Sequence, residues 1–373
     1  MKLQYSLYIG VILMIFFNNL IAVNARMDQV NRYNRQGEIF PNLRNADNGS
    51  SRVDVEQAPE IIPGGDEDLG TQLIIRKKHI RRWWDVTLGS SAIYVSNMLL
   101  QSDRYAVDTT LLVSTVQLHL APDPIDINGN KLYLGCGFIH NWFNYGLGDN
   151  GSMFRYQGDI SQDDLGGYNE FDFDSQTIQL GLNYLINDSW GVKLGFKYTR
   201  LLGHEISHVF PQTSNYSETY KEYAPSWGCY KFFNFSPTMS LNVGYTGTLY
   251  YTDSENPNPE DQIDGTNRRD INNRLESSLS LNLRQQIVPT VFASPFFFFK
   301  YSNYNMNENR NDLSYKNRED FTYTYGSAFS WDITEWFTLS TYGSWEKRKS
   351  SSNRVAEYAK YDLGGGFSAT VRF

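Results

Sequence analysis

The sequence predicts an all-β protein, a transmembrane antiparallel up-and-down β-barrel of about twelve strands, with about ten or fourteen strands as alternatives. Three observations support this prediction. Apolar and polar residues alternate along most of the chain from residue 83 onward. Connections between the alternating segments are short at one end and long at the other. The chain also ends on an alternating segment that finishes with Phe373. Together these features are typical of a closed sheet with one face in lipid.

The composition fits a barrel better than a soluble globular protein. Of 373 residues, 40% are apolar and the mean hydropathy is -0.48, yet the chain has 26 Tyr and 23 Phe. Transmembrane barrels concentrate aromatic residues in girdles at the membrane interfaces. The net charge of -8 excludes a nucleic-acid partner, because binding phosphates requires a positive surface. The two cysteines, Cys136 and Cys229, are too few for a disulfide-stapled domain.

Residues 1–25 form a segment distinct from the rest of the chain. Lys2 provides a positive n-region, Ile9–Phe17 is an apolar run of h-region length, and Val23 and Ala25 are small residues at cleavage positions. The apolar run is too short to cross a bilayer as a helix. We therefore expect a signal peptide cleaved near Ala25, and no cysteine follows it that would anchor a lipoprotein.

Residues 26–82 are polar and lack periodicity. They contain an acidic cluster at 65–70 (GDEDLG) and a basic cluster at 76–82 (RKKHIRR). Such a composition is typical of a flexible segment, so we expect a flexible periplasmic N-terminal extension over 26–82. A plug or a docking segment is the alternative.

The barrel is expected over residues 83–373. Between residues 177 and 199 two alternating segments flank an Asn187-Asp188 turn, which predicts a β-hairpin with one apolar and one polar face. The apolar face carries Ile178, Leu180, Leu182, Tyr184, Ile186, Trp190, Val192, Leu194, Phe196 and Tyr198. Similar hairpins are expected around Ser236–Thr238, Pro289-Thr290 and Thr334-Glu335. Pro225 and Pro295 leave the phase of their segments ambiguous and suggest bulges or edge strands.

Short turns at one end and long polar loops at the other are typical of outer-membrane barrels. Because the outer face of such a barrel must be apolar, the apolar rows should contact lipid and the charged residues between them should face the lumen. The predicted lumen residues are Lys193, Lys197, Arg274, Glu276, Arg284 and Asp332. A partly basic lumen attracts anions. Alternatively, these charges pair with one another inside the barrel, for instance through Glu276 and Asp332.

The last strand carries a more specific signal. The apolar positions Tyr361, Leu363, Phe367, Val371 and Phe373 alternate with polar or small residues up to the end of the chain. This pattern resembles the C-terminal strand signature of Gram-negative outer-membrane β-barrel proteins, and the hairpin pattern extends the resemblance to a porin-like chain over residues 83–373. The resemblance implies that the barrel-assembly machinery recognises this strand and that the strand closes the sheet against the first one.

Three groups of residues carry side chains of the kinds found in catalytic or metal sites. His204–His208 matches H-E-x-x-H, but that zinc motif requires a helix, and in extended chain the two histidines lie about 13 Å apart. Outer-membrane phospholipases and omptin-like proteases use barrel-borne histidines, but the patterns His140-Asn141 and Thr115–His119 do not reproduce their sites. Acidic loop residues around 159–164 and 260–264 fit no calcium motif. We therefore predict no catalytic residue, metal or cofactor.

The function predicted from the sequence is passive passage of small hydrophilic solutes, with anionic solutes as one option, across a bacterial outer membrane. Outer-membrane lipid, the barrel-assembly machinery and the solutes are the expected partners. Two alternatives remain: a structural or interaction barrel whose lumen is blocked, for instance by residues 26–82, and an outer-membrane barrel hydrolase.

Overall fold

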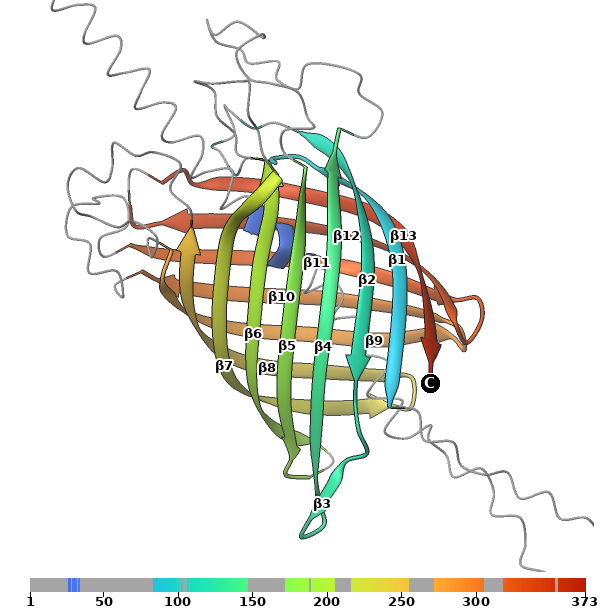
Figure 1. The fold of residues 1–373 in the computed structure, drawn as a ribbon. Coiled ribbons are helices and arrows are strands. Elements are labelled where there is room, and N and C mark those ends of the chain that lie inside the picture. Colours follow the sequence, from blue (N-terminus) through green and yellow to red (C-terminus); the bar gives the residue numbers. More distant parts are fainter. Residues whose placement is uncertain are drawn as a thin grey trace, which may run out of the picture.

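A computed structural model describes residues 26–33 except 28 and 32, 83–146 except 99, 101, 103–105 and 107, 172–204 except 188, 216–254, 272–304, and 318–373 except 353–354. Thirteen strands form one antiparallel sheet (Figure 1). They are β1 (Trp84–Val95), β2 (Thr109–Leu120), β3 (Ile125–Ile127), β4 (Asn130–Tyr145), β5 (Phe173–Leu185), β6 (Trp190–His204), β7 (Tyr216–Ser236), β8 (Met239–Ser254), β9 (Arg274–Val288), β10 (Val291–Asn303), β11 (Glu319–Asp332), β12 (Phe337–Ser350) and β13 (Tyr358–Arg372).

The sheet closes on itself. β1 pairs with β13 on one side and with β2 on the other, and β2 pairs directly with β4. The short strand β3 pairs with β4 and extends beyond the ring, which leaves a barrel of twelve strands. The predicted fold class and strand number are therefore confirmed.

Alternation in the sequence produces a barrel with two different faces. In the β5–β6 hairpin, Leu182 pairs with Leu194 and Ile178 with Tyr198. Leu180 is 52% exposed and Leu194 is 58% exposed, as expected for side chains on the outer wall. In the opposite phase of the same two strands, Thr177 and Thr199 are buried on the inner face and their hydroxyl oxygens lie 3.1 Å apart. The apolar row therefore forms the outside and the polar row the inside.

The connections differ between the two ends of the barrel. At one end the strands are joined through residues 186–189, 237–238, 289–290 and 333–336. At this end the β3–β4 turn also has positive φ at Asn128 (55°) and Gly129 (84°), the conformation of a tight hairpin turn. At the opposite end the connections span residues 146–172, 205–215, 255–273 and 304–318. The predicted asymmetry is confirmed.

Both uncertain prolines lie inside continuous strands. Pro225 pairs with Phe196 across the β6–β7 ladder, and Pro295 pairs with Ser327 across the β10–β11 ladder. On their other side the two prolines are unpaired: Pro225 has no partner on β8, and Pro295 has no partner on β9. Because proline lacks an N–H group, it interrupts one ladder while the closed sheet keeps the strand in place. The expectation of bulges or edge strands at these prolines is therefore wrong.

The last strand completes the ring. β13 pairs with β1 from Asp85 to Val95, and the backbone N–H of Phe373 donates to the carbonyl of Trp84 at 2.8 Å. The side chains of Leu363, Phe367 and Val371 are each at least half exposed on the outer wall. The closing role implied by the resemblance is thus seen in the fold, while recognition of this strand by the assembly machinery stays a prediction.

Two neighbouring glycines in β13, Gly365 and Gly366, provide a test of packing where β13 pairs with β1. A Cβ on Gly366 would lie 2.5 Å from Ser91 Cβ and closer still to the Ser90 carbonyl, whereas a Cβ on Gly365 would meet nothing closer than 3.6 Å. We expect Gly366→Ala to lower the unfolding free energy by about 1–3 kcal/mol because overpacking forces β1 and β13 apart. Gly365→Ala should change it by less than about 0.5 kcal/mol. Urea unfolding in lipid vesicles measures both, and equal stability of the two variants would contradict this account.

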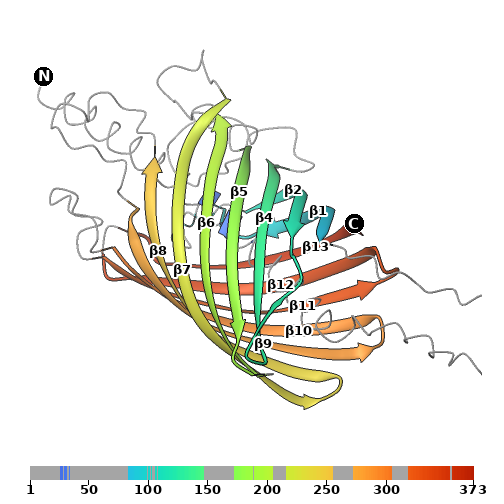
Figure 2. The ribbon, with the colours of Figure 1, turned by 60° about the horizontal axis from the view of Figure 1, so that its bottom comes forward.

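A short helical segment lies inside the barrel. The described residues between Arg26 and Tyr33 are helical, and Figures 1 and 2 show this segment enclosed by the strands. For these residues the structure differs from the expected flexible periplasmic extension, because the wall supplies packing partners that the polar sequence itself does not reveal. Residues 34–82 lie outside the described part of the chain. Among the described residues, no helix is long and apolar enough to cross a membrane.

Candidate functional site: the barrel lumen

The inner wall is rich in hydroxyl, amide and charged groups. Asn141 is fully buried, and its amide nitrogen lies 3.1 Å from Ser175 Oγ while its amide oxygen lies 2.8 Å from Thr115 Oγ1. These three side chains come from β4, β5 and β2, which the register places side by side. Hydrogen bonds between neighbouring strands therefore satisfy buried polar groups on the inner wall.

Two of the predicted lumen residues belong to a buried charge network on β7, β9 and β10. Arg274 Nε lies 2.7 Å from Glu276 Oε1, and the terminal guanidinium nitrogen lies 3.4 Å from Glu222 Oε2. Lys300 Nζ lies 3.6 Å from Glu276 Oε1, and the Tyr220 hydroxyl donates to Glu222 at 3.0 Å. Among the described residues, two carboxylates thus face two cations, so this part of the network is electrically balanced.

A second network occupies β11, β12 and β13. Glu346 accepts from the hydroxyls of Thr324 at 2.7 Å and Tyr358 at 2.8 Å. Lys360 is 1% exposed, and its Nζ lies 3.9 Å from the Asp362 carboxylate. The Arg348 guanidinium stacks over the Tyr358 ring at 4.5 Å. Of the residues that the structure describes here, Lys360 and Arg348 are the two cations and Glu346 and Asp362 the two carboxylates.

The four other predicted lumen residues lie outside these networks. Lys193 and Lys197 alternate with the exposed apolar residues of β6. The Lys193 side chain is exposed. The Lys197 side chain donates a hydrogen bond from Nζ to Asn31 Oδ1 at 3.0 Å. The Arg284 guanidinium lies 4.4 Å from the centre of the Phe292 ring. Asp332 accepts from the Thr338 hydroxyl at 2.6 Å. Internal pairing therefore holds Arg274 and Glu276, but through Glu222 and not through Asp332.

Sequence reasoning did not identify several charged residues of these networks: Glu222, Lys300, Glu346, Lys360 and Asp362. Each lies on a strand in the phase opposite to exposed apolar residues such as Tyr223, Tyr361 and Leu363. This alternation with apolar residues was the sequence signal that could have assigned these five residues to the lumen. In β7 and β10 it was obscured by the prolines and by the run of four phenylalanines at 296–299.

The structure separates the residues considered for hydrolase chemistry. Asn141 is fully buried on the inner wall, while His140 is turned to the outer wall, where its ring lies 4.1 Å from that of Trp142. His119 lies 3.9 Å from Asp85, and Thr115 hydrogen bonds with Asn141. Since adjacent residues on a strand point to opposite faces, His140 and Asn141 cannot act on one substrate atom. His204 ends β6, and residues 205–208 lie outside the described part of the chain.

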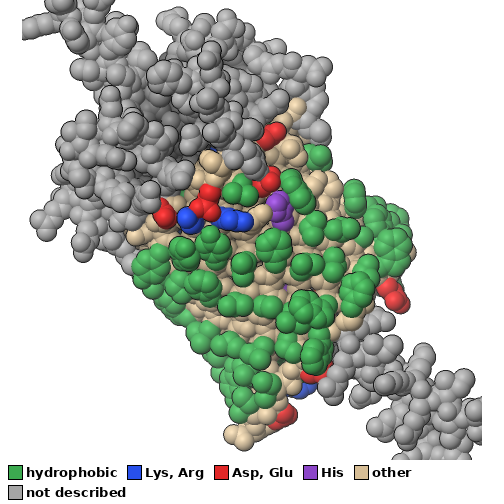
Figure 3. Space-filling model, viewed as in Figure 1, with side chains coloured by type: hydrophobic (Ala, Val, Ile, Leu, Met, Phe, Trp, Pro, Cys, Tyr) green, Lys and Arg blue, Asp and Glu red, His purple; other side chains and the backbone are tan. Residues whose placement is uncertain are grey.

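The outer wall has an apolar belt with a polar border. Figure 3 shows apolar side chains covering the wall over β4–β7, with acidic and basic side chains beside them towards the long-connection end. His140 Nδ1 lies 3.1 Å from Gln176, whose amide oxygen accepts from Arg200 at 2.7 Å. Arg200 lies 3.8 Å from Glu218, which pairs with Lys221 at 2.7 Å. A polar ladder at this level fits the headgroup region above a hydrocarbon layer.

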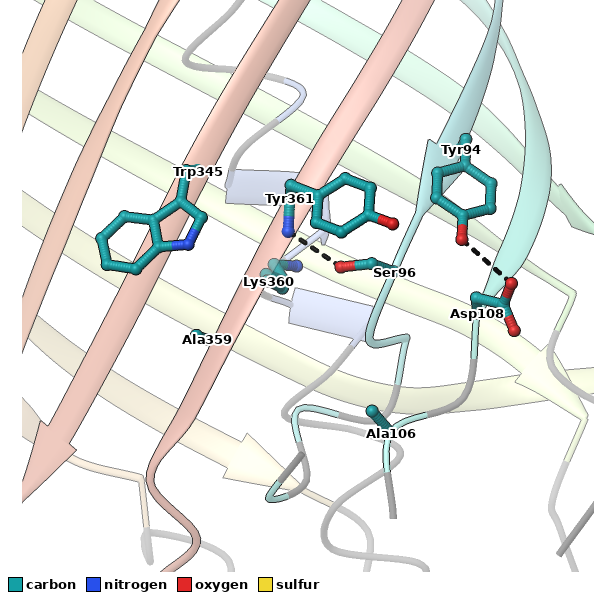
Figure 4. Close-up of a pocket in the computed structure, with 8 residues that line it drawn as sticks. All are labelled: Tyr94, Ser96, Ala106, Asp108, Trp345, Ala359, Lys360 and Tyr361. Atoms are coloured by element: carbon teal, nitrogen blue, oxygen red, sulfur yellow. Dashed lines mark hydrogen bonds between the residues drawn. The ribbon is translucent and has the colours of Figure 1, made fainter. Parts of the chain in front are cut away.

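Aromatic residues accompany this border on the other side of the barrel. A pocket of about 360 Å³ lies beside Tyr94, Trp345 and Tyr361 (Figure 4). The Tyr94 hydroxyl donates to Asp108 at 2.9 Å, and the rings of Tyr94 and Tyr361 lie 5.8 Å apart. Aromatic rings with polar tips are typical of the membrane interface, so this pocket belongs to the girdle of the outer wall.

A closed twelve-strand barrel with an apolar outer belt and a polar, charged interior defines the class: this protein is an outer-membrane-type β-barrel. No protein-family model matches the chain, and no curated protein matches it.

Solved structures of outer-membrane barrels resemble its fold. The outer membrane channel of Pseudomonas putida F1 is 10% identical, with a TM-score of 0.49 over 78% of this chain and 97% of that chain. The β domain of the Bordetella autotransporter BrkA is 12% identical, with a TM-score of 0.42 over 78% and 100%. The anion-selective porin of Comamonas acidovorans is 9% identical, with a TM-score of 0.34 over 78% and 99%. At these identities the similarity concerns the fold alone.

Proposed function

We propose that this protein is an outer-membrane channel for passive passage of small hydrophilic solutes, with a preference for anions. The observation that carries the proposal is the contrast between the two walls: apolar groups cover the outside, while hydroxyl, amide and charged groups line the inside. A structural barrel with no passage would need no such interior, because a dry core is stabilised by apolar packing.

The preference for anions follows from the balance of charge. The two networks around Arg274 and Glu346 have equal numbers of cations and carboxylates. The remaining predicted lumen residues are Lys193, Lys197 and Arg284 against the single carboxylate of Asp332. An excess of basic groups along a pore favours anions over cations.

Reversal of one lumen charge tests this proposal. At about 0.1 M salt, where screening extends over about 10 Å, Lys193→Glu should lower the anion-to-cation permeability ratio by about twofold or more. Lys231→Glu is the matched control, because Lys231 lies on the outer wall with its Nζ 4.8 Å from the Trp190 ring and 4.7 Å from the Phe233 ring. Reversal potentials in planar bilayers under a KCl gradient measure both. Cation preference in the unaltered protein, or an equal shift in the control, would contradict the proposal.

The alternative of a blocked lumen has one specific observation in its favour, the helix that lies inside the barrel. It predicts that the full chain has no conductance in planar bilayers, because the helix never leaves the lumen.

A further inference from the structure

The helix inside the barrel packs against the wall through one buried face. Arg26 is 3% exposed, Met27 5%, Gln29 5% and Val30 0%. Successive residues of an α-helix are about 100° apart, so these four side chains lie within an arc of about 160° on one side of the axis. Asn31 and Tyr33 are half-buried.

Polar contacts fix the helix to three strands. The Tyr33 hydroxyl lies 2.9 Å from Thr115 Oγ1 on β2, and the Tyr33 ring packs edge-on against Phe143 of β4 at 6.0 Å. Lys197 of β6 donates to Asn31 at 3.0 Å. These contacts combine hydrogen bonding with aromatic packing, so they fix the orientation of the helix as well as its depth.

Apolar residues gather around the helix at one level of an otherwise polar wall. Met27 and Val30 belong to a buried cluster to which eight strands or their ends contribute: Ile93, Val95, Met98, Leu111, Val113, Phe143, Tyr145, Phe173, Leu201, Tyr220, Ala328 and Tyr342. A wall that only faced water would gain nothing from these side chains. Their burial against the helix removes apolar surface from water, which stabilises the enclosed position.

The dimensions of the barrel agree with this packing. Twelve strands spaced about 4.8 Å apart and tilted by about 40° give a backbone diameter of about 24 Å. Side chains from opposite walls take up about 5 Å each, which leaves about 14 Å. An α-helix with its side chains is about 10–12 Å wide. One helix therefore fills most of the cross-section.

The direction of the helix is also defined. Arg26 lies near the long-connection end, where its guanidinium is 5.6 Å from the centre of the Phe173 ring and so close to Gly203 that a Cβ added there would lie 3.2 Å from it. Tyr33 lies deeper, beside Thr115 in the middle of β2. The helix therefore fills the half of the lumen nearest the long connections.

We propose that the lumen is a binding site for this chain's own segment Arg26–Tyr33, and that the bound helix is a plug that closes the channel until it is displaced. The proposal rests on the channel function proposed above. In the closed channel the apolar cluster holds the helix, and in the open channel the polar wall lines the path of the solutes. Solutes pass when the helix leaves, because its side chains occupy the space that the solutes need.

Conductance of the full chain in planar bilayers tests the closing role. Val30→Asp places a carboxylate in the apolar cluster without a partner, which disfavours the bound helix. We expect the open time to rise by about tenfold or more. Thr290→Asp, the control, adds the same carboxylate at an exposed turn away from the helix and should stay within about twofold of the unaltered protein.

Thiol labelling tests the position of the helix independently of conductance. In a Cys136→Ala, Cys229→Ala background, Val30→Cys should be protected from a bulky maleimide in the folded barrel and should react after unfolding. Ser351→Cys, at an exposed position after β12, should react in both states.

The outcomes separate the plug from the channel. Protection of Val30→Cys together with opening by Val30→Asp supports the plug. Labelling of Val30→Cys as fast as Ser351→Cys overturns it. Equal conductance of the unaltered protein and Val30→Asp overturns the plug and leaves the channel. If neither the unaltered protein nor Val30→Asp conducts, both the channel and the closing role of the helix are overturned. This holds even if Val30→Cys is protected from the maleimide and the helix therefore lies in the lumen.

Discussion

Arg274→Met should lower the unfolding free energy of the barrel by about 3–5 kcal/mol, since it leaves buried carboxylates without their cation. Arg274 is 8% exposed, while Glu222 is 0% and Glu276 8% exposed. The guanidinium also lies 3.9 Å from the centre of the Tyr250 ring. Without Arg274, Lys300 remains the cation 3.6 Å from Glu276, and the buried network gains one net negative charge.

The control for this prediction is Arg200→Met on the outer wall. The Arg200 side chain is 41% exposed and lies 3.8 Å from Glu218, a geometry that contributes less than about 1 kcal/mol. Adding Glu222→Gln to Arg274→Met restores the balance of charge and should recover part of the loss. Denaturant unfolding of the refolded barrel in lipid vesicles measures each variant. If Arg274→Met proved as stable as Arg200→Met, the network would not hold the strands together as described.

Leu194→Arg should cost about 2–4 kcal/mol of folding free energy, because it places a charge on the lipid face near the middle of the membrane. Leu194 is 58% exposed and lies on β6 four residues from Trp190 and four residues from Tyr198. The guanidinium would have to extend to one interface or draw water into the hydrocarbon layer.

The control for Leu194→Arg must place the same charge on the outer wall at a different depth in the membrane. Ile186 is 47% exposed and follows β5 at the short-turn end, so Ile186→Arg should cost no more than about 1 kcal/mol. Unfolding in vesicles of defined thickness measures the difference between the two variants. Equal costs would show that the belt over β5 and β6 does not face hydrocarbon.

Much of the barrel could be predicted because the signals are local. The alternation of Ile178, Leu180 and Leu182 with Thr177, Gln179 and Gly181 assigns each residue to a face without knowledge of its neighbours across the sheet. The turn at Pro289-Thr290 and the apolar row of the last strand are equally local. The prolines were interpreted wrongly because their effect depends on which ladder they interrupt, which only the paired neighbours decide.

The lumen was less accessible to prediction. Six charged residues could be placed on a polar face, but Glu222 and Arg274 are 52 positions apart along the chain. Only the register of the β7–β8 and β8–β9 pairings brings them within an ion pair. The helix at Arg26–Tyr33 left a weak signal, since Met27, Val30 and Tyr33 recur every three residues in a polar segment. Such spacing fits a helix face but does not reveal what that face packs against.

The amino-acid order alone predicts the all-β class, the two faces of the strands, the short turns and the closing strand that ends at Phe373, because a period of two residues is a property of the extended backbone. The contents of the lumen depend on how the strands pair and close. Closure sets which inner side chains meet, and the space that remains, about one helix wide, is filled by residues that precede the first strand by more than fifty positions.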